Sequence, residues 1–119
     1  MKIAIPAQQN SLDSQVDEHF GRAKGFIVYD SDTGSYTWIE NKQSVQSTQG
    51  AGIQSAKNVI DNGAEVLIAT NVGPKAYSIL RSSGVEVYVC DSMLVSQAIA
   101  EYKAGKLVKA TEAIVESHW

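Results

Sequence analysis

The sequence predicts an α/β fold in which helices cover the faces of a five-stranded mixed sheet, giving three α/β/α layers. Two observations carry this prediction. The expected elements follow the order βββαβαβα, so hairpin-joined strands come before strand–helix–strand units. Such units require right-handed crossovers between parallel strands, and a sheet of order 3-2-1-4-5 with strand 2 antiparallel satisfies both patterns.

Three strands are expected in the first third of the chain. Residues 2–6 (KIAIP) form a short strand that a proline ends, because proline cannot donate to a β-ladder. Residues 26–29 (FIVY) and 36–40 (YTWIE) are hairpin partners around the turn sequence DSDTG. Residues 7–24 form a long polar loop, and loops of that length in compact domains are usually functional or disordered.

Two helices and a buried strand follow. Apolar residues recur at helical spacing from Ile53 to Ile60, and an Asn-Gly pair ends this helix. Residues 65–70 (EVLIAT) have the character of a buried strand. The next helix begins at Pro74, since proline suits a first helical position, and a Ser-Gly pair ends it.

The last elements are a strand at 85–90 (VEVYVC) and a helix at 93–103. We expect Asp91 or Ser92 to cap this helix, because short polar side chains are favoured there. After the helix the pattern is ambiguous and permits both a strand at 107–108 and a final helical turn.

Length and composition narrow the class of protein. The 119 residues are expected to form one domain, residues 1–119. The net charge of −3 and the lack of a dense Lys/Arg cluster argue against nucleic-acid binding. Because no apolar run suits a signal peptide or a membrane span, we expect a cytoplasmic protein without a membrane partner, as a monomer or weak dimer. With Cys90 as its single cysteine, the chain alone builds no disulfide and no Cys-rich metal site.

The predicted topology gathers several residues at one edge of the sheet. Four strands end at this edge, the three helices begin there, and the loop 7–24 leaves from it. Ligands of open α/β sheets bind outside the carboxyl ends of the strands, where helix N-termini favour anions. The residues expected along this edge are His19, Arg22, Gly50, Gly52, Asn71, Gly73 and Cys90.

The stretch DEHFGRAKGF is the strongest functional candidate. His19 offers an imidazole, the commonest metal ligand, and Arg22 offers a guanidinium that can donate to the sulfide or oxygen atoms of an anion. Gly21 between them is a flexible backbone position. Spacing alone also permits a structural interpretation, in which His19 bonds within its own loop and Phe20 plugs the sheet edge. The two acidic residues before the histidine are expected to face solvent.

The glycine-containing helix starts and the cysteine each permit two interpretations. Gly50 and Gly52 could bring backbone N–H groups close to a ligand, or could simply begin an ordinary helix. Asn71 and Gly73 have the same two interpretations. The absence of GxGxxG and of a Walker lysine disfavours nucleotide binding. Cys90 is either a soft-metal ligand or a small buried hydrophobic residue.

Most of the chain resembles the dinitrogenase iron–molybdenum cofactor biosynthesis family. The stretches that carry the resemblance are MKIAIPA, VDEHFGRAKGFIVYD, GAGIQSAKNVIDNGAEVLIATNVGPKAYSILRSSGVEVYV and the closing helix. The family signature HFGRA is present, and a second signature, GxGPxA, reads NVGPKA here. The family includes small nitrogenase accessory proteins and the orange protein of sulfate reducers. The resemblance implies a ribonuclease H-like fold without nuclease activity.

The resemblance also implies a ligand. Members bind a molybdenum- or iron-containing sulfide cluster non-covalently, and His19 matches the suspected ligand. Many members carry a second histidine shortly before the glycine-rich helix start, where this chain reads Ser47-Thr48-Gln49-Gly50. This difference favours weaker binding of the cluster, or binding of another cluster such as a molybdenum–copper sulfide.

We therefore expect a non-enzymatic carrier or assembly scaffold for such a cluster, with cluster donor or acceptor proteins as partners. His19 and Cys90 are the candidate metal ligands. The expected cofactor-binding residues are His19, Phe20, Gly21, Arg22, Gly50, Gly52, Asn71 and Gly73.

Two alternatives stay open. One is a metal-free interaction module that docks on a redox or ATPase partner through Tyr36, Trp38 and Trp119, since aromatic residues often anchor interfaces. The other is a small-phosphate or nucleotide enzyme that uses the helix start at Gly50 and Gly52.

Overall fold

A single mixed β-sheet runs through the molecule. The computed structural model describes residues 1–42 and 50–114, and within these ranges six strands pair in the order β3-β2-β1-β4-β5-β6. The strands are β1 (Lys2–Ala7), β2 (Gly25–Asp30), β3 (Tyr36–Glu40), β4 (Val66–Ala69), β5 (Glu86–Val89) and β6 (Val108–Lys109). The helical elements are the 3-10 turn η1 (Phe20–Arg22), α1 (Ala51–Asp61), α2 (Pro74–Ser82) and α3 (Val95–Lys103). None of the helices in these ranges has the length and apolar character needed to cross a membrane.

The first five strands have the predicted order, and β2 is antiparallel to both of its neighbours. β1 and β4 are parallel, as are β4 and β5. The prediction of five strands is wrong, because β6 adds an antiparallel sixth strand beside β5. β6 consists of Val108 and Lys109, both exposed, and it is shifted by one residue from the strand at 107–108 that the ambiguous pattern permitted.

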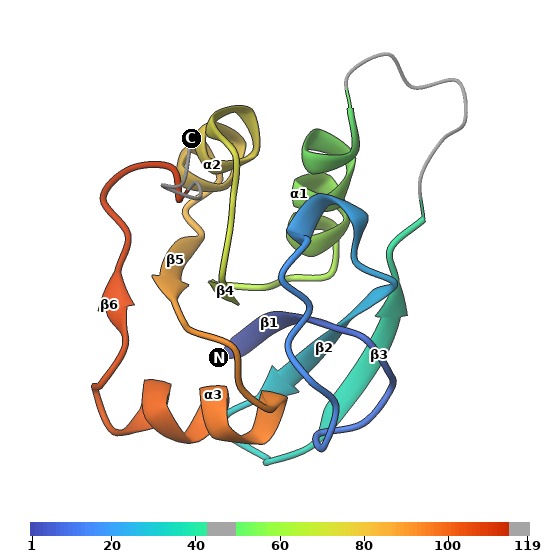
Figure 1. The fold of residues 1–119 in the computed structure, drawn as a ribbon, viewed down its shortest axis with the longest axis vertical. Helices are drawn as coiled ribbons and strands as arrows, with labels where there is room; N and C mark the ends of the chain where they lie inside the picture. Colours follow the sequence, from blue (N-terminus) through green and yellow to red (C-terminus); the bar gives the residue numbers. More distant parts are fainter. Residues whose placement is uncertain (43–49, 115–119) are drawn as a thin grey trace.

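The pleat of the strands divides the core into two clusters. In β1, Ala4 faces the cluster beneath α1 and α2, whereas Ile3 and Ile5 face the cluster beneath α3. Figure 1 shows α1 and α2 on one side of the sheet and α3 on the other. The structure therefore has the three predicted layers, while the assignment to a ribonuclease H-like fold stays a prediction.

The first half of the long loop after β1 packs on the α3 side. The buried hydroxyl of Ser14 accepts hydrogen bonds from the N–H groups of Gln8 and Gln9, at 3.1 and 3.0 Å. The N–H of the buried Val16 donates to the carbonyl of Met93 at 2.9 Å. These bonds fix the point at which the chain leaves this face and turns toward η1.

The start of α3 differs from the prediction. The helix begins two residues later than expected, and Leu94, rather than Asp91 or Ser92, occupies the cap position. The side-chain oxygen of Gln97 accepts the N–H of Leu94 at 2.9 Å, so a residue inside the first turn bonds the backbone there. The hydroxyl of Ser92 instead donates to the carboxylate of Glu18 at 2.7 Å. The prediction of the cap was therefore wrong, and the Ser92 side chain is hydrogen-bonded to a loop that is distant in sequence.

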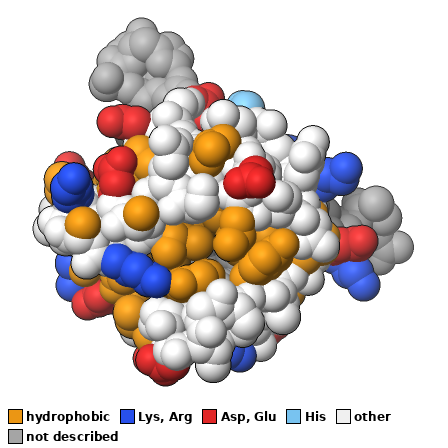
Figure 2. Space-filling model, turned by 90° about the horizontal axis from the view of Figure 1, so that it is seen from below, with side chains coloured by type: hydrophobic (Ala, Val, Ile, Leu, Met, Phe, Trp, Pro, Cys, Tyr) orange, Lys and Arg blue, Asp and Glu red, His pale blue; other side chains and the backbone are white. Residues whose placement is uncertain are grey.

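The α3 layer leaves part of its sheet face uncovered. Among the described residues, the nine-residue helix α3 is the helix that lies on this face. Six hydrophobic side chains that pack against its core remain partly exposed, namely Leu12, Trp38, Tyr88, Met93, Tyr102 and Leu107. Figure 2, a view from below, shows hydrophobic side chains gathered in the middle of the visible face.

Gly25 at the start of β2 leads to a stability prediction. A Cβ at Gly25 would lie 2.3 Å from Cζ2 of Trp38 and 2.7 Å from the backbone oxygen of Ile39. The ring can turn, but the carbonyl belongs to the sheet and cannot move freely. We expect Gly25→Ala to lower the free energy of unfolding by about 1–3 kcal/mol, measured by urea denaturation.

Gly73→Ala serves as the control for this prediction. A Cβ at Gly73 meets no atom within 4 Å, and its φ of −69° is accessible to alanine. Gly73→Ala should therefore change the stability little. Equal stabilities of the two variants would contradict the packing argument.

Candidate functional site

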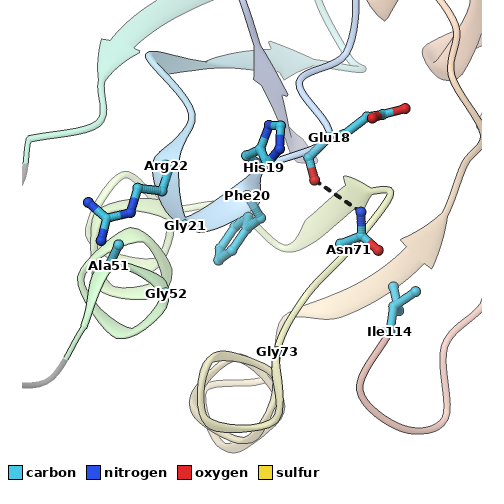
Figure 3. A pocket seen from close by; sticks show the side chains of 10 residues that line it. All are labelled: Glu18, His19, Phe20, Gly21, Arg22, Ala51, Gly52, Asn71, Gly73 and Ile114. Carbon is cyan, nitrogen blue, oxygen red and sulfur yellow. Dashed lines mark hydrogen bonds between the residues drawn. The ribbon is translucent and has the colours of Figure 1, made fainter. Parts of the chain in front are cut away.

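An open pocket lies where η1 meets the N-terminal ends of α1 and α2 (Figure 3). Its volume is about 630 Å³, within the range of about 300–1,000 Å³ that is usual for small-molecule sites. The lining residues are Glu18, His19, Phe20, Gly21, Arg22, Ala51, Gly52, Asn71, Gly73 and Ile114. The pocket is therefore built from four separate segments of the chain.

The pocket brings together most of the residues that the sequence predicted. Seven of them line it, namely His19, Phe20, Gly21, Arg22, Gly52, Asn71 and Gly73. They meet because η1 follows β1, α1 follows β3 and α2 follows β4, so all three segments leave the same edge of the sheet. Gly50 precedes α1 with a φ of 92° and is outside the lining. The binding roles of these residues stay predictions.

His19 precedes η1 and presents its ring to solvent, with 79% of the side chain exposed. Its Nδ1 lies 3.4 Å from Oδ1 of Asp17. The same Asp17 oxygen accepts the backbone N–H of His19 at 2.9 Å, which fixes the local turn. The carboxylate therefore lies on the Nδ1 side of the imidazole, and Nε2 lies on the other side of the ring.

The position of Asp17 was missed by sequence reasoning. We expected its carboxylate to face solvent, but its side chain is only 15% exposed. An aspartate two residues before the histidine is the signal that could have indicated this turn, because Asp side chains often bond the backbone two residues on.

Phe20 is primarily a core residue. It is buried in the cluster beneath α1 and α2, and its ring centroid lies 5.6 Å from that of Phe26 at an interplanar angle of 59°. The structural interpretation of Phe20 therefore holds, and the pocket contacts the accessible part of a ring that anchors η1 to the sheet.

Arg22 is exposed, and it makes no ion pair with any residue in the described ranges. In Figure 3 its guanidinium points away from His19, toward the side of the pocket where Ala51 begins α1. The two side chains therefore flank the pocket rather than contact each other. The permanent positive charge of the guanidinium therefore lies at the edge of the pocket next to the start of α1.

The starts of α1 and α2 add partial positive charge. Neither helix has a side-chain cap or an acidic residue in its first turn. Their first N–H groups lack intrahelical partners, and the helix dipole favours an anion there. Glu18 is the acidic residue of the lining, and its carboxylate accepts the Ser92 hydroxyl. Asn71 donates to the Glu18 carbonyl at 3.2 Å, which links the loops after β1 and β4.

A buried polar network holds η1 against α1. The amide of Asn41 donates to the carbonyl of Ala23 at 2.9 Å and accepts hydrogen bonds from Ser55 and Asn58 at 3.1 and 2.9 Å. The hydroxyl of Ser55 also lies 3.0 Å from the carbonyl oxygen of Gly21, to which it can donate a hydrogen bond. Sequence reasoning missed Asn41 and Ser55, because no local pattern shows that they meet.

Ile114 was also missed by sequence reasoning. Its N–H and carbonyl bond the backbone of Val72, at 2.9 and 2.8 Å, and its side chain lines the pocket. The ambiguous tail after residue 105 thus returns to the site and forms one of its walls.

Cys90 lies apart from the pocket. It is buried in the cluster beneath α3, on the opposite face of the sheet from Phe20. Burial raises the pKa of its thiol to about 11. The structure therefore does not bring Cys90 together with His19. Among residues 1–42 and 50–114, no three His, Cys, Asp or Glu side chains form a group that could hold a metal ion.

The predicted aromatic anchors are only partly available. Tyr36 is exposed, whereas Trp38 packs against the α3-side core and covers Gly25. Trp119 lies outside the described residues, as does the stretch Ser47-Thr48-Gln49 before α1.

Comparison with known sequences confirms the resemblance. A family model described as dinitrogenase iron-molybdenum cofactor matches residues 1–105. An uncharacterized protein from Methanocaldococcus jannaschii is 33% identical in an alignment of 114 residues that covers 92% of this chain and 91% of that protein. Ile114 lies beyond the part that the family model matches.

Solved structures give the same result. The apo form of the orange protein from Desulfovibrio gigas has a TM-score of 0.88 and 36% identity, over 94% of each chain. The structure of a putative NifB protein from Thermotoga has a TM-score of 0.81 and 33% identity, over 98% of each chain.

The buried network predicts a stability effect at Asn41. Asn41→Ala removes the donor to Ala23 and the acceptor shared by Ser55 and Asn58, and leaves buried polar groups without these bonds. We expect the free energy of unfolding to fall by about 1–3 kcal/mol, measured by urea denaturation. Asn62→Ala is the control, because that amide makes one exposed bond to the carbonyl of Asn58. Equal effects of the two substitutions would contradict the role of the network.

The raised pKa of Cys90 predicts low reactivity. Because the folded protein keeps this thiol buried and protonated below a pKa of about 11, iodoacetamide at about pH 8 should leave it unmodified. The same reagent should alkylate the protein fully in urea. Mass spectrometry distinguishes the two forms, and rapid alkylation of the folded chain would show that the thiol is accessible.

Proposed function

The chain belongs to the dinitrogenase iron–molybdenum cofactor family, and from this premise we propose that it binds an anionic metal–sulfide cluster as cargo. The cargo would contain molybdenum or iron, with copper as a further candidate metal, and would be held non-covalently. In this proposal the protein is a carrier or an assembly scaffold and catalyses no reaction. Two relatives support it, since one is an orange protein with an apo form and the other a putative NifB protein.

One observation carries the proposal. The pocket places an exposed imidazole, an arginine without an ion pair in the described ranges, and the starts of two helices around one open volume. Such a site supplies one metal ligand and several groups that stabilise negative charge. A cluster that brings its own sulfide ligands needs little more from the protein.

In this proposal His19 binds a metal of the cluster through Nε2. Its ring is open to solvent, and Asp17 stands on the Nδ1 side, which is the arrangement that orients metal-binding histidines in many proteins. The exposure of the ring lets a bulky cluster approach and leave without movement of the core.

Arg22 and the two helix starts would neutralise the charge of the cluster. The guanidinium can donate to sulfide atoms, and the N–H groups at the starts of α1 and α2 add donors without side-chain entropy. Gly52 and Gly73 stand at these starts, where the lack of a side chain lets a ligand approach the backbone closely.

Anaerobic reconstitution tests the proposal directly. The protein is incubated with tetrathiomolybdate and a copper or iron salt, desalted, and examined by absorption spectroscopy and metal analysis. We expect a retained chromophore with a fixed ratio of metal to protein. A desalted protein without chromophore or metal would refute the cargo proposal.

The two flanking residues should fail differently when they are replaced. His19→Ala removes a bond to the metal, so binding should weaken and the absorption spectrum should change. Arg22→Ala removes an exposed charge-assisted donor of about 0.2–1 kcal/mol, so affinity should fall modestly while the spectrum keeps its shape. Lys57→Ala is the matched control for Arg22, because it removes one exposed positive charge from α1 outside the lining. Identical spectra for His19→Ala and wild type would exclude His19 as a ligand.

A further inference from the structure

The pocket has two kinds of lining. One part carries groups that attract anions, and the other part is an apolar wall. Ile114 forms part of this wall, and Figure 3 shows its side chain beside Asn71, across the pocket from Arg22. Two backbone hydrogen bonds to Val72, of 2.8 and 2.9 Å, hold Ile114 in this place. The other apolar surfaces are the ring of Phe20 and the methyl group of Ala51.

An apolar wall discriminates between anions by their hydration. Oxygen atoms that carry negative charge bind water strongly, so moving them against hydrocarbon costs free energy. Sulfur atoms are larger and more polarizable, bind water more weakly, and make favourable contacts with apolar side chains. Two anions of equal charge and shape can therefore differ in affinity for this pocket through the wall alone.

We propose that Ile114 is a specificity-determining residue that makes the pocket favour sulfide-bearing anions over oxyanions. The inference rests on the proposed function, since it concerns the same pocket and its cargo. It goes beyond the family match, because Ile114 lies outside residues 1–105. The effect on anion affinity comes from the apolar character of the Ile114 side chain. The position of this side chain depends on backbone hydrogen bonds, which a substitution at Ile114 retains.

Tetrathiomolybdate and molybdate are matched probes for this inference. Both are tetrahedral dianions of the same metal, and they differ in the atoms that would face Ile114. The dissociation constants of both anions are measured by anaerobic equilibrium dialysis with molybdenum analysis, for wild type, Ile114→Val and Ile114→Thr. Valine and threonine have nearly the same shape, so their comparison isolates the polarity of the wall.

We expect wild type and Ile114→Val to bind tetrathiomolybdate more tightly than molybdate. In Ile114→Thr this preference should fall by about three- to tenfold relative to Ile114→Val, because a hydroxyl now faces the anion. Ile79→Thr is the control, since Ile79 is also partly buried against the same core cluster but does not line the pocket. It should retain the wild-type preference.

The outcomes separate the two proposals. If wild type binds tetrathiomolybdate but Ile114→Thr and Ile114→Val show the same preference, Ile114 is not a specificity residue and the cargo proposal stands. Equal affinities of wild type for the two anions would also overturn the inference. If wild type binds neither anion, with or without added copper or iron, both proposals fail.

Discussion

The close contact between η1 and the first turn of α1 is the constraint on which the pocket depends. A Cβ at Gly21 would lie 3.0 Å from the nitrogen of Gly52, so a larger residue would push the two segments apart. Ser55 and Asn41 hold this contact through hydrogen bonds to the backbone that follows His19. Because α1 also packs on the sheet, the same contact fixes where the imidazole and the guanidinium stand relative to the helix dipoles.

This contact explains how the two candidate binding residues can lie at the surface while their backbone is held in place. His19 and Arg22 are exposed, but the backbone between them is tied to buried groups, Phe20 below and Ser55 beside it. The two side chains are therefore exposed, while the backbone that carries them is packed and hydrogen-bonded. The geometry of such a pocket depends more on the buried residues that hold its backbone, here Phe20 and Ser55, than on contacts among the side chains that line it.

The sequence predicts the parts of the structure that depend on local patterns. The strand order and the gathering of residues 19–22 with Gly52 and Gly73 follow from element order and handedness alone. The pairing of β6 with β5 and the return of Ile114 to the pocket depend on contacts with distant segments, which the ambiguous pattern after residue 105 does not specify. The turn at Asp17 is local, and it was missed because the spacing of Asp17 and His19 was not used. The position of Cys90 was predicted only in part. A residue that follows a strand lies at the expected edge of the sheet, but element order does not decide on which face of the sheet its side chain is buried.

The composition of the pocket also bears on how tightly a cargo would be held. In the proposed function one exposed imidazole would provide a single bond to a metal, and the remaining attraction would come from a surface guanidinium and backbone dipoles, which water and salt screen. Cys90, the strongest soft ligand in the chain, lies protonated beneath the opposite face. A site without a thiolate and with one open side favours reversible binding, because a competing set of ligands can approach the cluster before the protein releases it. Under the proposed function, this geometry would suit the transfer of a cargo to a partner better than its permanent retention.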